Sequence, residues 1–98
     1  MKESQLPDDQ MSDEEILKDR ADKYGPATRC FETWATMCEE LNKYAKESPN
    51  TNIPQLYALK MDLLKIVRSV WNPKIKDNYK DGRNYLTIAH QCSEEKHD

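Results

Sequence analysis

Apolar residues recur every three or four positions along most of this chain, which is the spacing of one face of an α-helix. The longest such run covers residues 27 to 46, and its apolar positions are Ala27, Cys30, Phe31, Trp34, Met37, Cys38, Leu41, Tyr44 and Ala45. A second run has a wider apolar face, because Met61 and Leu64 are apolar in addition to the inward positions Leu56, Leu59, Leu63, Ile66, Val67 and Val70. The pattern predicts that the second run is a central helix with neighbours on two sides.

Local signals set the helix boundaries in the first half. Ser12 followed by Glu15 forms a capping box, which predicts a short first helix as far as about Lys23. Gly25 supplies a left-handed stop, and Pro26 suits the first turn of the next helix because its φ is pre-set. We therefore expect a tight corner between the first two helices.

Turn formers and prolines set the boundaries in the second half. Residues 48 to 52 are dense in turn formers and close the long helix, and Asn52 or Ile53 caps the next one, which has Pro54 just inside. That helix ends before Pro73, since the residue that precedes a proline is disfavoured in the helical region.

A fourth helix is expected from about Asp77 to Cys92. Its inward face is expected to consist of Tyr79, Gly82, Tyr85, Leu86, Ile88, Ala89 and Cys92. A glycine inside a helix costs about 1 kcal/mol relative to alanine. Gly82 therefore indicates that a partner backbone passes close to it or that another group needs the room.

These elements predict an all-α fold, a compact bundle of about four helices joined by short loops, and no strand-like alternation is present. Residues 1–11 show no apolar period and read as a disordered acidic leader. Residues 12–92 form the single helical domain, and residues 93–98 are a charged tail.

Composition narrows the function classes. The chain has 98 residues, 37% of them hydrophobic and 34% charged, which is enough for one modest core. Fifteen Lys+Arg against eighteen Asp+Glu give a net charge of -3, so general nucleic-acid binding is not expected. No stretch reaches the roughly 20 apolar residues that span a bilayer, and the N-terminus lacks a signal peptide. We expect no membrane contact and a cytoplasmic location.

Cysteine usage agrees with that location. Cys30, Cys38 and Cys92 are odd in number and widely spaced, with no C-x-x-C pair. The pattern predicts three buried or half-buried thiols in a reducing compartment.

A row of acidic residues opens the fourth helix. Asp77 and Asp81 are one turn apart on one face. Asp77 could simply be an N-cap with Asp81 in the first turn, or the two could hold a cation, a ligand or a basic row. Lys65 and Arg68 supply such a basic row on the third helix, and an antiparallel fourth helix would bring the two rows together, as an internal brace or as a ligand site.

A basic cluster, Arg20, Lys23, Tyr24 and Arg29, surrounds the first corner. N–H groups at a helix start can bind anions, so an anion site is one interpretation. Solvated surface charge is the other.

Catalytic signatures are incomplete. Metal-dependent all-α nucleotide pyrophosphatases need Glu-x-x-Glu on one helix and Glu-x-x-Asp on another. After Glu39 and Glu40 the chain has Lys43, and Leu59 stands three residues before Asp62. His90 and His97 have no nucleophile partner. The sequence favours a non-catalytic protein over an enzyme, and it predicts no cofactor and no metal site.

An ordered set of motifs carries a family resemblance. The motifs are Arg20-x-x-x-Tyr24-Gly25, Phe31-x-x-Trp34, Leu63-Leu64-Lys65-x-x-Arg68, Pro73 and Asp77-x-x-x-Asp81-x-x-x-Tyr85. This order resembles a family of small phage and prophage proteins classed as a domain of unknown function. The resemblance implies a phage-encoded accessory protein acting in the cytoplasm of a bacterial host. More distantly, the last block is similar to the Asp-rich helix of all-α nucleotide pyrophosphatases.

Three functions follow as hypotheses. The first is a non-catalytic binding module for a phosphate-bearing, nucleotide-type ligand, with basic residues on the anion and Tyr24 or Trp34 against an aromatic face. Its candidate ligand-binding residues are Arg20, Lys23, Tyr24, Arg29, Trp34, Lys65, Arg68, Asp77, Asp81 and Tyr85. The alternative is a protein-binding inhibitor of a host defence system, such as an anti-CRISPR factor. A divergent Mg²⁺-dependent nucleotide hydrolase is third, and a homodimer is compatible with all three.

Overall fold

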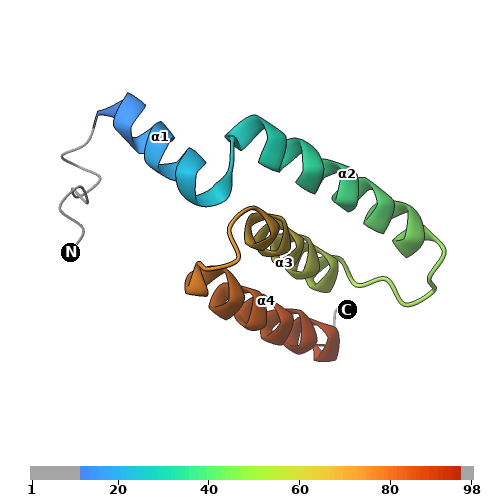
Figure 1. The fold of residues 1–98 in the computed structure, drawn as a ribbon. Coiled ribbons are helices and arrows are strands. Elements are labelled where there is room, and N and C mark those ends of the chain that lie inside the picture. The colour runs from blue at the N-terminus through green and yellow to red at the C-terminus, as the bar shows by residue number, and fades with distance from the viewer. Residues whose placement is uncertain (1–11, 96–98) are drawn as a thin grey trace.

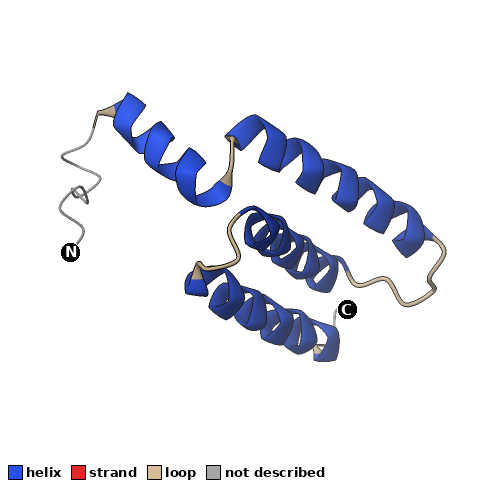
Figure 2. Ribbon diagram, in the orientation of Figure 1, coloured by secondary structure: helices blue, strands red, loops and turns tan. Residues whose placement is uncertain are grey.

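The computed structural model describes residues 12–95, which fold into four helices (Figure 1). The helices are α1 Asp13–Tyr24, α2 Ala27–Lys46, α3 Ile53–Trp71 and α4 Lys76–Glu94. Within residues 12–95 every regular element is a helix and there is no strand (Figure 2). The all-α prediction is confirmed. The expected leader, residues 1–11, and the last three residues of the expected tail lie outside the described residues.

The predicted caps are present where they depend on neighbouring residues alone. The Ser12 hydroxyl accepts from the Glu15 backbone N–H at 3.1 Å, and the Glu15 carboxylate accepts from the Ser12 N–H at 3.1 Å. These bonds lower the pKa of Glu15. Gly25 ends α1 with a positive φ of 86°. The Asn52 side chain caps α3 by accepting from Gln55 N–H at 2.9 Å.

Three boundaries differ from the prediction, and one is the end of α4, which lies at Glu94 instead of about Cys92. Pro26 is the N-cap of α2, with ψ 128°, so it precedes the first helical turn instead of lying in it. Helix α4 begins at Lys76 after Ile75 as N-cap, without a side-chain cap bond. The interpretation of Asp77 as an N-cap is therefore wrong, and Asp77 lies in the first turn, where the helix dipole favours a carboxylate.

Helix α3 is the centre of the fold, as its wide apolar face predicts. It packs along α4 as an antiparallel hairpin, and on its other side it contacts α2 and the end of α1 (Figure 1). Its buried residues are Leu56, Ala58, Lys60, Asp62 and Leu64. Burial of a lysine and an aspartate beside three apolar residues shows that polar groups also lie between the helices.

The apolar core of residues 12–95 is thin. Its buried apolar residues are Cys30, Leu56, Ala58, Leu64 and Ala89. Phe31, Ile66, Val70, Tyr79, Leu86 and Ile88, all expected to face inward, are exposed, with Val70 at 81%. The expectation that these apolar helix faces are fully covered is wrong. Helices α2 and α4 each pack mainly on α3, and one helix covers only a narrow face of its neighbour.

The three cysteines are as predicted: Cys30 is buried, Cys38 and Cys92 are half-buried, and all are free thiols. Burial raises the pKa of the Cys38 thiol, although the nearby Lys60 charge acts in the opposite direction. None of the helices in the described residues is long and apolar enough to cross a membrane.

Candidate functional site

The acidic and basic rows meet at one point only. Lys65 Nζ lies 3.2 Å from Asp81 Oδ2, across the interface of α3 and α4. The Lys65 side chain is 15% exposed, so this ion pair is better shielded from water than the surface pairs of the protein. The antiparallel arrangement expected from the sequence thus brings Asp81 to Lys65, whereas Asp77 is exposed and forms no ion pair with either basic residue.

Arg68 turns away from this pair and toward α1. Its guanidinium carbon lies 4.5 Å from the centroid of the Tyr24 ring, in a cation–π arrangement. The Arg68 Nε atom is buried without a hydrogen-bond partner in the described residues. Lys65 and Arg68 therefore serve two different interfaces and do not form a single anion-binding row.

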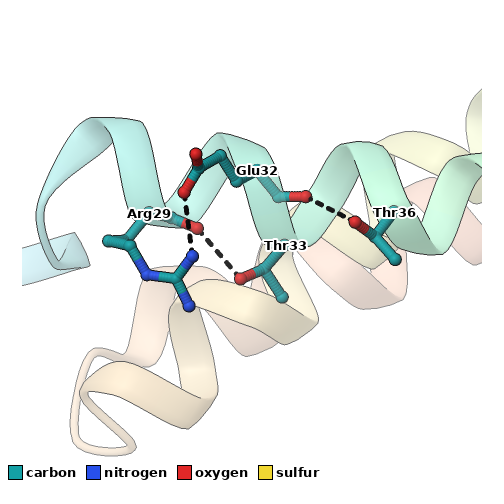
Figure 3. A network of polar contacts seen from close by, with 4 residues as sticks. All are labelled: Arg29, Glu32, Thr33 and Thr36. Atoms are coloured by element: carbon teal, nitrogen blue, oxygen red, sulfur yellow. Dashed lines mark hydrogen bonds and ion pairs between the residues drawn. The ribbon is translucent and has the colours of Figure 1, made fainter.

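The corner cluster is mostly paired within its own helices. Lys23 Nζ lies 3.2 Å from Asp19 on α1. Arg29 donates to Glu32 at 2.8 Å on the outer face of α2, where Figure 3 also shows Thr33 bonded to the Arg29 carbonyl oxygen. Arg20 is exposed on α1. These local pairs favour the interpretation of the cluster as solvated surface charge.

Trp34 joins two helices. Its indole Nε1–H donates to the Lys60 carbonyl oxygen at 2.6 Å, and the ring is half-buried between α2 and α3. The Phe31 ring lies against it, tilted by 56° with centroids 6.2 Å apart. Trp34 therefore holds α2 on α3. Tyr85 is half-buried on α4.

The carboxylates of the hydrolase hypothesis do not come together. Glu40 pairs with Lys43 at 2.9 Å on the exposed surface of α2, and Glu39 is also exposed there. In residues 12–95 no group of three His, Cys, Asp or Glu side chains is placed to hold a metal ion.

A cavity of about 450 Å³ opens between α3 and α4, and we refer to it as the α3–α4 groove. Its lining residues are Asp62, Lys65, Ile66, Ser69, Val70, Asn78, Tyr79, Gly82, Arg83 and Leu86. The volume lies in the range of small-molecule sites, and the lining combines apolar walls with a few polar groups. Of the predicted residues, Lys65 lines this groove.

Asp62 is the most unusual residue of the groove. It is only 8% exposed. No described residue donates a hydrogen bond to its carboxylate or forms a salt bridge with it. Burial raises the pKa of Asp62 above its ordinary value of 3.8, because the charged form is poorly solvated there. A buried carboxylate without a partner is costly to the fold, which makes Asp62 a candidate for binding.

Gly82 gives that carboxylate its room. A Cβ atom at Gly82 would lie 2.9 Å from Asp62 Oδ1. The sequence offered two reasons for this glycine: a close partner backbone, or another group that needs the room. The structure supports the second reason, because the Asp62 carboxylate lies too close to leave space for a Cβ atom.

Asn78 adds a second unsatisfied group to the same groove. The residue is 3% exposed, and its Nδ2 atom is buried without an acceptor. An unmade hydrogen bond of this kind costs about 1–3 kcal/mol. Two polar side chains, each more than nine-tenths buried and each unsatisfied, therefore line one cavity.

Positive charge lies at the edge of the groove. Arg83 is exposed on α4 and forms no ion pair with any of the residues that the structure describes. The Tyr79 ring is held in place because its hydroxyl donates to the Pro73 carbonyl oxygen at 2.7 Å. The Ser69 hydroxyl donates to the Lys65 carbonyl oxygen at 2.8 Å, so its oxygen is still able to accept.

A second cavity of about 430 Å³, the corner groove, lies where the α1–α2 corner meets the end of α3. Tyr24, Met37 and Trp71 are among its lining residues. Ile66 and Val70 line both the corner groove and the α3–α4 groove.

Sequence reasoning missed Asp62, Asn78 and Arg83 as members of a site. The available signals were a charged residue inside the apolar third helix and a glycine inside the fourth. Each signal is weak alone. Joining them requires the register between α3 and α4, which only the fold supplies.

The Asp62→Asn variant is expected to be more stable than the wild type by about 1 kcal/mol at pH 7, because it removes an unpaired buried charge. The folded protein holds the Asp62 proton more tightly than the unfolded chain does. Wild-type stability should therefore fall as pH rises from about 3.8 to the raised folded-state pKa.

Urea denaturation between pH 3 and 8 measures this effect. The stability gain of Asp62→Asn should grow with pH over that window and vanish below it. The exposed Asp22, changed to Asn, is the matched control and should show no such trend. A gain that is the same at every pH would contradict an unfavourable buried charge.

Comparison with known proteins identifies the family and nothing beyond it. The sequence matches, over residues 10–93, the model of a family described as a domain of unknown function (DUF6378). The matched region contains α1, α2, α3 and all but the last residue of α4. No curated protein and no solved structure matches the chain.

Proposed function

This chain belongs to the DUF6378 family, a domain of unknown function, and from its own geometry we propose that it is a small non-catalytic binding module for a phosphate-bearing, nucleotide-type ligand. The ligand site of this proposal is the α3–α4 groove. The observation that carries it is the pair of buried, unsatisfied polar side chains, Asp62 and Asn78, that line this cavity.

The chemistry of the groove favours a flat polar ligand with an anionic end. Asp62 and Asn78 offer hydrogen bonds at depth, which suits the edge of a nucleobase. The Tyr79 ring and the apolar walls offer a surface for the face of the base. Arg83, at the edge, carries the planar guanidinium that binds phosphate oxygens in pairs.

This proposal revises the set of binding residues expected from the sequence. Lys65 stays in the set because it lines the groove, while Arg68 and Trp34 are engaged in contacts between helices. The resemblance to small phage and prophage proteins supports an accessory role of this kind. The alternative, a protein-binding inhibitor of host defence, stays a prediction, as does the homodimer.

Isothermal titration calorimetry with nucleoside 5′-monophosphates tests the proposed function. We expect binding by the wild type and about tenfold weaker binding by Arg83→Gln, since a charge-assisted bond to phosphate contributes about 1.5–3 kcal/mol. Lys80→Gln removes one charge from the same helix, outside the groove, and should bind as the wild type does.

Two results would contradict the proposal. One is the absence of heat for every nucleotide at millimolar concentration. The other is equal weakening by Arg83→Gln and Lys80→Gln, which would mean that the nucleotides respond to overall charge instead of this groove.

A further inference from the structure

We infer that the α3–α4 groove selects a guanine-type base, with the Asp62 carboxylate reading the hydrogen-bond donor edge of that base. The inference rests on the proposed function, because it names the ligand class of the same groove. It starts from the position of one carboxylate that is buried, unpaired and open to the cavity.

An ionised carboxylate only accepts hydrogen bonds, and its two oxygens accept well from two parallel N–H groups. Guanine presents such a pair on one edge, from N1–H and the N2 amino group. Adenine presents one N–H beside the bare N1 acceptor, which would face a carboxylate oxygen with no proton between them. A site built around Asp62 therefore distinguishes the two purines by the donors on that edge.

Asn78 complements this arrangement. A side-chain amide has both a donor and an acceptor, and its Nδ2–H group has no acceptor in the described residues. Beside the two donors, the guanine edge carries the O6 acceptor. Donation from Nδ2–H to O6, while Asp62 accepts from N1–H and N2–H, requires the covered Asn78 amide to turn toward the ligand.

Another class of ligand presents the same donor pair, and the test below distinguishes it. A guanidinium group, as in an arginine side chain, also presents two parallel N–H donors, but it carries a positive charge. Lys65 is already paired with Asp81, so Arg83 supplies the positive charge at the edge of the groove, where it attracts the phosphate of a nucleotide. A neutral base that carries a phosphate fits both the buried carboxylate and the basic edge.

Gly82 leaves room for the Asp62 side chain beside α4. Because a Cβ atom at residue 82 would lie only 2.9 Å from Asp62 Oδ1, the carboxylate lies close to the backbone of α4. A ligand in the groove meets the carboxylate between two helices, where a hydrogen bond discriminates more strongly than at a fully exposed position.

The test compares the affinities of GMP, IMP and AMP by isothermal titration calorimetry. The three share the ribose and the phosphate, and IMP keeps N1–H and O6 but lacks the N2 amino group. We expect GMP to bind about tenfold more tightly than AMP, with IMP between them, which is the discrimination that a bidentate pair provides.

Variants locate the discrimination. Asp62→Asn should bring the GMP-to-AMP affinity ratio close to one, mainly through weaker GMP binding, because an amide cannot accept from both donors. Asp22→Asn makes the same change at an exposed position on α1 and should keep the wild-type ratio. Circular dichroism establishes that each variant remains folded.

The outcomes separate the inference from the proposed function. Equal binding of GMP and AMP, tighter binding of AMP, or an unchanged ratio in Asp62→Asn overturns guanine selection and leaves nucleotide binding intact. Tighter binding of L-argininamide than of GMP also overturns it, by showing that the donor pair belongs to a cation. No binding of any nucleotide overturns both.

Discussion

Replacement of Gly25 by alanine is expected to lower the free energy of unfolding by about 3 kcal/mol. Gly25 has φ 86° and ψ 168°, a region that is essentially restricted to glycine and costs other residues about 1–3 kcal/mol. The new Cβ would lie 2.9 Å from Trp71 Cδ2 and 3.1 Å from Cγ. These atoms are at the base of the indole ring, so the ring cannot move aside without leaving its place at the end of α3. Chemical denaturation measures the loss.

The second glycine provides a matched control for this prediction. Gly82→Ala places a Cβ 2.9 Å from Asp62 Oδ1, which is the free end of a side chain that can rotate. The helix gains up to about 1 kcal/mol in propensity, so we expect a net change within about 1 kcal/mol of zero. Equal losses at Gly25 and Gly82 would contradict the role given to the Trp71 contact and to the backbone at the corner.

Replacement of Trp34 by alanine is also expected to lower the free energy of unfolding by about 3 kcal/mol, near the low end for loss of a tryptophan because the ring is half-buried. The change removes the Nε1–H bond to the Lys60 carbonyl oxygen and the largest side chain between α2 and α3. Urea denaturation measures the loss. Hydrogen exchange should show faster exchange in α2, while the hairpin of α3 and α4 keeps its protection.

Trp34→Phe separates the two contributions. It retains an aromatic ring between the helices and loses the hydrogen bond. We expect this loss to lower the free energy of unfolding by about 1 kcal/mol. If Trp34→Ala speeds exchange equally in all four helices, α2 unfolds together with the hairpin of α3 and α4, which would contradict the local effect expected here.

Helix positions could be predicted from the sequence because their signals are local. The Ser12–Glu15 capping box and the Asn52 cap each act within four residues, so neither depends on the rest of the fold. Where the signal was ambiguous, as at Pro26 and Asp77, the predicted boundary was wrong by one or two positions.

Contacts between helices were predicted less completely, for a physical reason. The antiparallel connection of α3 and α4 was enough to place Asp81 near Lys65. The contact of Arg68 with Tyr24 depends on where the corner at Gly25 sends α1, which no local signal records. Periodicity likewise identifies an apolar face but not whether a neighbour covers it, and Val70 is exposed for that reason.

The side chains of Ile66 and Val70 form a wall shared by the α3–α4 groove and the corner groove. A molecule that displaces this wall from one side changes the shape offered on the other, which would link the two binding equilibria. Linkage is reciprocal: an occupant of the corner groove that alters nucleotide affinity by some factor has its own affinity altered by the same factor. Through these two side chains, a domain of four helices has the physical means to make the binding of one molecule depend on another.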